Sequence, residues 1–117
     1  RTLARDCDAT FSGGNVFRDY MHVDDIGSGL IALLDSNLDG ICNICSGTPE
    51  RLSDIIAYIG KLSRREDLIH FGARSKRSEE PNWIVGDNSK IRSTGWASSI
   101  SLQQGLEQTY AWWQQTI

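Results

Sequence analysis

The sequence predicts a small α/β fold in which short strands alternate with three main helices. Apolar residues recur at helical spacing in three separate segments, so each segment is expected to form a helix with one apolar face. Short apolar runs lie between these segments and are typical of strands. The chain of 117 residues has the length of one domain, which we take as residues 1–117.

The three helices are predicted from their first residues and their apolar faces. Asp24 or Asp25 can cap the opening turn of the first helix by accepting hydrogen bonds from its free N–H groups. The second helix opens at Ser53, and the third begins with a capping box of Ser101 and Gln104. The faces expected to be buried are Ile26, Leu30, Leu33 and Leu34 in the first helix, Ile55, Ile56, Ile59 and Leu62 in the second, and Leu102, Leu106, Tyr110, Trp113 and Ile117 in the third.

The strands are predicted to be short and few. A strand is expected where RDYMHVDD begins at Arg18, and the apolar run ICNIC, residues 41–45, indicates a buried strand. Two further strands are predicted at residues 68–72 and 83–86. A sheet this small would leave apolar faces uncovered. We therefore expect either a packing partner outside this sequence or self-association through the exposed apolar surface.

Composition excludes several classes of protein. The net charge of −3 argues against a general nucleic-acid binder, because neutralising phosphates requires a basic surface. No apolar run approaches the roughly 20 residues that span a bilayer, and no signal peptide is visible, so no membrane association is expected. Three cysteines, an odd number, disfavour a disulfide framework and indicate a reducing compartment, and hence a cytoplasmic protein.

A complete catalytic set is missing from the sequence. There is no G-x-G-x-x-G loop for a dinucleotide, and none of the tyrosines is followed four residues later by a lysine. We therefore assign no catalytic residue to this chain. Cys42 and Cys45 form a C-x-x-C pair, which raises the alternative of a metal or redox site. Because a structural zinc ion needs four ligands, we favour two small core residues and expect no metal.

Four motifs, in order, resemble the extended short-chain dehydrogenase/reductase family of nucleotide-sugar epimerases, dehydratases and reductases. RDYMHVDD is similar to the family pattern R-D-[FYW]-[IL]-[HY]-V-x-D, and ICNICSGTPERLSDI to Y-N-[IL]-G-x-G-x-x-x-S-[IL]. FGARSKRSEEP resembles a basic loop whose arginines meet the substrate diphosphate, and GDNSKIRSTGW is similar to A-D-x-S-K-x-x-x-L-G-W. The resemblance extends from Gly13 to the end of the chain.

The resemblance implies a two-domain parent enzyme. A large N-terminal Rossmann domain would hold NAD or NADP and the Tyr/Lys pair, and a small C-terminal domain would bind the nucleotide-diphosphate sugar. The chain would be this small domain, without the Rossmann core, and would by itself be inactive and bind no cofactor. The parent would act as an epimerase (an isomerase), a dehydratase or a reductase (an oxidoreductase). The alternative is a free-standing binding or interaction module without catalysis.

The resemblance also suggests which residues bind substrate. Arg18 matches the family arginine that contacts the substrate's phosphates or nucleotide, and a guanidinium fork can bond two phosphate oxygens at once. Arg74 and Arg77 compete for a second diphosphate contact, and Asn43 matches an asparagine that touches substrate in some members. The alternatives are that Arg18 pairs with Asp19 or with a helix terminus, and that the basic run is a solvated face.

Overall fold

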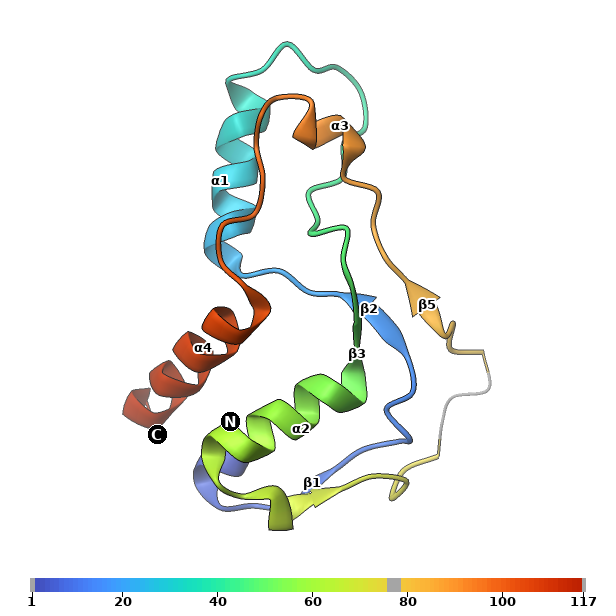
Figure 1. The fold of residues 1–117 in the computed structure, drawn as a ribbon, viewed down its shortest axis with the longest axis vertical. Coiled ribbons are helices and arrows are strands. Elements are labelled where there is room, and N and C mark those ends of the chain that lie inside the picture. Colours follow the sequence, from blue (N-terminus) through green and yellow to red (C-terminus); the bar gives the residue numbers. More distant parts are fainter. Residues whose placement is uncertain (1, 76–78, 117) are drawn as a thin grey trace.

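The chain folds into four α-helices and five short strands, counted over residues 2–75 and 79–116, which the computed structural model describes (Figure 1). The α/β class is confirmed, as are the three main helices. In chain order, the elements are η1 (Leu3–Arg5), β1 (Ala9–Thr10), β2 (Phe17–Asp19), α1 (Val23–Leu34), β3 (Pro49–Arg51), α2 (Leu52–Ser63), η2 (Glu66–Leu68), β4 (Ile69–His70), β5 (Trp83–Ile84), α3 (Ser89–Arg92) and α4 (Leu102–Thr116).

The strands form two small sheets. In the larger sheet β2 lies in the middle, antiparallel to β3 and parallel to β5. Arg18 therefore has Glu50 opposite it on one side and Ile84 on the other. In the second sheet β1 and β4 pair in parallel. The strands predicted at Arg18, at 68–72 and at 83–86 are confirmed, though each is shorter than or displaced from the expected range, and β3 was not expected.

The strand predicted at residues 41–45 does not form in the described part of the chain. The segment runs without regular structure between α1 and β3. Side chains hold it at two carbonyl groups: Lys90 Nζ donates to Ile41 O at 2.8 Å, and Asn88 Nδ2 donates to Cys45 O at 3.2 Å. A strand requires hydrogen bonds to a neighbouring strand, so an apolar run alone does not produce one.

The N-terminus of α1 is capped by His22, so the prediction of an aspartate cap is wrong. His22 Nδ1 accepts a hydrogen bond from the Asp24 backbone N–H at 3.3 Å. The Asp25 side chain turns instead to the segment before α4 and is 2% exposed. It accepts hydrogen bonds from the Ser99 N–H (3.0 Å), the Ser99 hydroxyl (2.9 Å) and the Ile100 N–H (3.0 Å). The carboxylate therefore ties α1 to Ser99 and Ile100, which follow Asp25 by 74 and 75 positions in the sequence.

The apolar face of α1 is largely exposed, which corrects its predicted burial. Leu34 is 83% exposed and Leu30 is 50% exposed. The residues of α1 that are buried are Asp25 and Gly29. Helical periodicity identifies an apolar face but not what packs against it, so burial was inferred without a partner. The exposed large apolar residues of α1, called the α1 stripe below, are Val23, Ile26, Leu30, Ile31 and Leu34.

The other two long helices follow their predictions closely. In α2, Ile55 and Ile56 are buried, and the rest of the predicted face is half-buried. In α4 the capping box forms, with Gln104 N–H donating to Ser101 Oγ at 3.2 Å and Ser101 N–H donating to Gln104 Oε1 at 3.1 Å. The predicted α4 face is half-buried as far as Trp113, and Ile117 lies outside the described residues.

The molecule is flat, and its elements are openly arranged in Figure 1. Its extents are 49 × 37 × 17 Å and its radius of gyration is 16.5 Å, whereas a compact domain of this length has about 13 Å. Within the described residues, the buried apolar side chains are Leu3, Ala9, Val16, Ile55, Ile56 and Ile91. Such a small core leaves much of the apolar surface uncovered.

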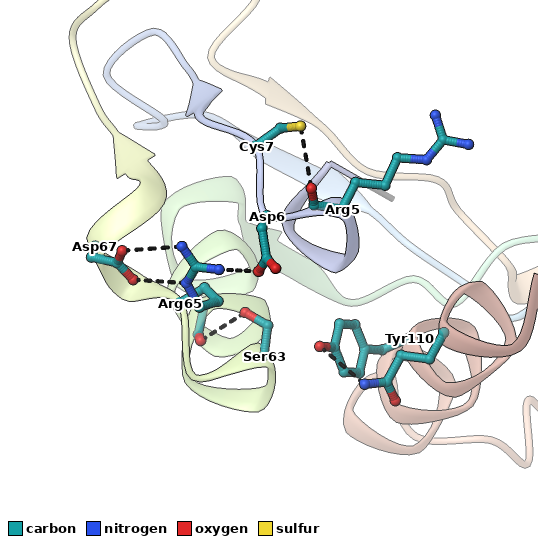
Figure 2. A network of polar contacts seen from close by, with 9 residues as sticks. Arg5, Asp6, Cys7, Ser63, Arg65, Asp67 and Tyr110 are labelled. Carbon is teal, nitrogen blue, oxygen red and sulfur yellow. Dashed lines mark hydrogen bonds and ion pairs between the residues drawn. The ribbon is translucent and has the colours of Figure 1, made fainter. Parts of the chain in front are cut away.

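An ion-pair network fastens the N-terminal segment to the end of α2 (Figure 2). Arg65 lies between Asp6 and Asp67 and pairs with both, its Nε donating to Asp67 Oδ1 at 3.2 Å. The hydrogen bond from Arg65 lowers the pKa of Asp67 below its ordinary value of 3.8. Arg65 is therefore engaged by acidic neighbours on both sides.

Two glycines of α1 are expected to respond to alanine in opposite directions. Gly27 has open space where a Cβ would stand, so Gly27→Ala should stabilise the protein by about 1 kcal/mol through helix propensity. At Gly29 a Cβ would lie 2.6 Å from Ile44 Cγ2 and 3.3 Å from the Trp96 ring. Gly29→Ala should therefore destabilise by about 1–3 kcal/mol. Urea unfolding of both variants measures the difference, and equal stabilisation of the two would contradict the close packing at Gly29.

Candidate functional site

A cleft of about 780 Å³ opens beside the three-stranded sheet. It collects residues from four parts of the chain: the end of β1 and the turn after it, the β2 strand, the segment between β4 and β5, and the β5 strand. The lining residues are Thr10, Phe11, Ser12, Arg18, Arg74, Ser75, Glu79, Glu80, Pro81 and Ile84. Two of the predicted substrate-binding arginines, Arg18 and Arg74, therefore share one cleft.

Arg18 is held from two sides. Its Nη1 donates to the Phe17 carbonyl at 2.8 Å, and its Nη2 pairs with Glu80 Oε1 at 3.1 Å. The Arg18 side chain is 19% exposed, so the guanidinium is oriented but still reaches solvent. The alternative that Arg18 pairs with Asp19 is wrong, because its recorded carboxylate partner is Glu80.

The other predicted binding residues are placed differently. Arg74 is exposed and donates from Nε to Thr10 Oγ1 at 2.9 Å, which fixes its stem on the cleft wall. Arg77 lies outside the described residues. Asn43 is exposed outside this cleft, where its Nδ2 donates to the Asp87 carbonyl at 3.3 Å. The structure brings Arg18 and Arg74 together and does not bring Asn43 to them.

Acidic residues of the cleft were missed by the sequence analysis. Glu79 and Glu80 line it beside Arg18 and Arg74, so the described charged residues of the lining are two cations and two anions. The signal was present in the sequence, because this acidic pair directly follows the basic run of the third motif. The prediction for this loop rested on its basic residues alone.

Asp19 is the structural anchor behind the cleft. Its Oδ1 accepts hydrogen bonds from the Ser46 N–H (3.0 Å) and hydroxyl (2.7 Å), and its Oδ2 accepts from the N–H groups of Gly47 (2.8 Å) and Gly86 (3.3 Å). Burial raises the pKa of the Asp19 carboxyl, but these hydrogen bonds outweigh it and hold the pKa below 3.8. One carboxylate thus joins β2, the loop after residue 45 and the end of β5.

Cys42 and Cys45 are not grouped with a third metal-binding side chain in the described residues. No group of three or more metal-binding side chains occurs within the described residues. Burial raises the pKa of the Cys45 thiol, and the negative charge of Asp19 adds to the effect. A raised pKa keeps the thiol protonated, which disfavours both metal ligation and thiol exchange.

The described residues do not fit a dinucleotide. Such a site needs glycines between a strand and a helix so that the backbone can approach the pyrophosphate. The connection from β2 to α1 carries Tyr20, Met21 and His22 instead, and α2 follows β3 with no intervening residue. Burial also raises the pKa of the Tyr20 hydroxyl, an effect that Arg18 partly offsets.

No helix in the part of the chain described here is long and apolar enough to cross a bilayer.

Comparison with known proteins gives consistent relatives. No family model matches the chain. GDP-L-fucose synthase 1 of Arabidopsis thaliana is 30% identical over 106 residues, which are 89% of this chain and 32% of that protein. The chain spans about a third of the length of the curated relatives it matches.

Solved structures share the fold. RMD from Pseudomonas aeruginosa, determined with NADPH, superimposes with a TM-score of 0.87 at 22% identity over 98% of this chain and 40% of its own. The UDP-glucuronic acid 4-epimerase of Bacillus cereus, determined with a UDP-sugar and NAD, has a TM-score of 0.85 at 27% identity, covering 100% of this chain and 39% of its own. With the four motifs, these matches show that the chain resembles the nucleotide-sugar enzymes of the extended short-chain dehydrogenase/reductase family over about a third of the length of its curated relatives.

Proposed function

We propose that residues 1–117 form the nucleotide-sugar-binding C-terminal domain of an NAD(P)-dependent epimerase, dehydratase or reductase. In this proposal the cleft holds the nucleotide diphosphate, and a Rossmann-type domain supplies NAD or NADP and the catalytic Tyr/Lys pair. The observation that carries the proposal is the meeting of Arg18 and Arg74, from separate motifs, on one cleft of about 780 Å³.

The chemistry of the cleft suits a diphosphate. A guanidinium presents paired N–H donors that match two phosphate oxygens, and each charge-assisted bond contributes about 1.5–3 kcal/mol. Arg18 is oriented by the Phe17 carbonyl, so little side-chain freedom remains to be lost on binding. The names of the relatives, which include GDP- and UDP-sugar enzymes, support the same class of substrate.

The uncovered apolar surface supports a second domain. The α1 stripe lies on a helix at the edge of the flat molecule, with α3 as the neighbouring helix in Figure 1. Burying apolar area yields about 25 cal/mol per Å², so a stripe of this kind provides a large part of a domain interface. The segment at residues 41–45 lies next to α1, because Ile44 Cγ2 sits close to Gly29, and it can contribute to the same interface. A cofactor domain docked there would bring the dinucleotide site that the described residues do not build.

Replacing Arg18 tests the proposed site. In the Arg18→Ala variant, affinity for UDP, GDP and their sugars should fall by more than about tenfold, because at least one charge-assisted bond to phosphate is lost. Isothermal titration calorimetry on the purified chain measures this directly. The matched control is Arg92→Ala, which removes the same charge from an exposed position on α3, outside the cleft.

Each outcome of this experiment is decisive. A tenfold loss for Arg18→Ala, with affinity kept in Arg92→Ala, supports diphosphate binding in the cleft. Equal losses in both variants would assign the effect to net charge instead. An unchanged affinity in Arg18→Ala, or no binding by the unsubstituted chain, would exclude the proposed role of the cleft.

A further inference from the structure

We propose that Glu80 is a built-in competitor for the diphosphate at Arg18: its carboxylate occupies the guanidinium in the free protein, and nucleotide binding exchanges one anion for the other. The inference rests on the proposed function, since it concerns the arginine that would receive the diphosphate. Its basis is the ion pair of 3.1 Å between Arg18 Nη2 and Glu80 Oε1, two side chains that line the same cleft.

Glu80 holds one of the donors through which Arg18 could bind a phosphate. Nη1 is committed to the Phe17 carbonyl at 2.8 Å, and β2 is fixed between β3 and β5. The carboxylate of Glu80 accepts a hydrogen bond from Nη2, and both residues line the cleft. A phosphate that makes a paired contact with the guanidinium through Nη2 competes with this carboxylate, because charge-assisted pairs require direct N–H···O contact.

The backbone keeps Glu80 close to this position. Pro81 follows it directly and has a fixed φ angle, and β5 begins two residues later at Trp83. β5 is in turn paired with β2, and the Phe17 N–H donates to the Asn82 carbonyl at 2.7 Å. The carboxylate is thus presented to Arg18 at a high effective concentration, which a ligand in solution must overcome.

Partial exposure makes the exchange feasible. The Glu80 side chain is 35% exposed and that of Arg18 is 19% exposed. A carboxylate released from Arg18 can therefore turn to water and does not become a buried, unpaired charge. The two cations and two anions of the described lining also sum to zero, so a diphosphate gains little from the cleft until Glu80 withdraws.

The test compares two glutamates of the same cleft. Inorganic pyrophosphate and UDP are titrated into the parent chain, Glu80→Gln and Glu79→Gln, with thermal unfolding to verify that all three are folded. Both variants remove one negative charge from the lining, but only Glu80 is the carboxylate paired with Arg18. Glu80→Gln should bind pyrophosphate and UDP about fivefold more tightly than the unsubstituted chain, because it removes the ion pair with Arg18. Glu79→Gln should tighten binding by less than about twofold, because it removes only a charge screened by solvent and salt.

A third variant separates this inference from the proposed function. In the Arg18→Ala background, adding Glu80→Gln should give no more tightening than Glu79→Gln gives, because there is no guanidinium left to compete for. Equal effects of the two glutamate variants, or weaker binding in Glu80→Gln, would overturn the competition while leaving diphosphate binding intact. If no variant binds pyrophosphate or UDP, both the inference and the proposed function are wrong.

Discussion

Replacing Asp25 by alanine is expected to lower the free energy of unfolding by about 3 kcal/mol. The side chain is 2% exposed and accepts hydrogen bonds from the Ser99 N–H, the Ser99 hydroxyl and the Ile100 N–H. Removing it leaves two backbone N–H groups without their acceptor, and each unsatisfied donor costs about 1–3 kcal/mol. The contact between α1 and the segment that enters α4 would loosen as a result.

The neighbouring aspartate provides the control. Asp24 has a side chain that is 75% exposed, so Asp24→Ala should change stability by less than about 0.5 kcal/mol. Urea unfolding followed by tryptophan fluorescence measures both variants, and Trp96 lies close to the site, since its Nε1 donates to Ser28 Oγ at 2.9 Å in α1. Similar stabilities for the Asp24 and Asp25 variants would contradict the assigned role of Asp25.

Acid should remove the same contribution in the parent protein. Burial raises the pKa of the Asp25 carboxyl, but the hydrogen bonds from Ser99 and Ile100 outweigh it, so the pKa lies below 3.8 in the folded state. A carboxyl with a depressed folded pKa stabilises the fold above its unfolded pKa, and this contribution is lost as the pH falls through the folded value. Asp25→Asn cannot titrate, so its stability should fall less steeply than that of the parent below about pH 4.

Features determined by local sequence were predictable. The capping box of Ser101 and Gln104 depends on residues three positions apart, and it forms as expected. The buried face of α2 was likewise found, because Ile55 and Ile56 lie against elements that this chain contains. Local rules of this kind need no knowledge of distant partners.

Features determined by partners far away in the sequence could not be predicted. The apolar run at residues 41–45 indicated a strand, but in the described chain it pairs with none of the strands. Asp25 fits a helix cap by position, yet Ser99 and Ile100 provide stronger contacts from 74 and 75 residues away. The Arg18–Glu80 pair spans 62 residues, and no pattern in the sequence gives its register. In the candidate site the arginines were therefore identified by their motifs, while the acidic partner was found only in the structure.

Replacing Asp19 by asparagine is expected to cost about 2 kcal/mol of stability and also to weaken nucleotide binding. Both carboxylate oxygens accept two hydrogen bonds each, so the amide nitrogen of asparagine would face N–H donors in either orientation. The control is Asp54→Asn, because Asp54 is exposed and pairs only with Arg51 among the described residues. Urea unfolding and calorimetry with pyrophosphate provide the two readouts, and parent-like values in both would contradict the prediction.

The coupling of these two effects follows from the strand that carries both residues. Successive side chains of a strand point to opposite faces, so Arg18 and Asp19 are directed to different sides of β2. On one side Asp19 binds the loop at Ser46 and Gly47 and the end of β5 at Gly86. On the other, Arg18 reaches the cleft, whose lining includes Ile84, its partner residue on β5. Loosening the first face is therefore expected to shift the second, so that a residue that does not line the cleft should affect the proposed binding there.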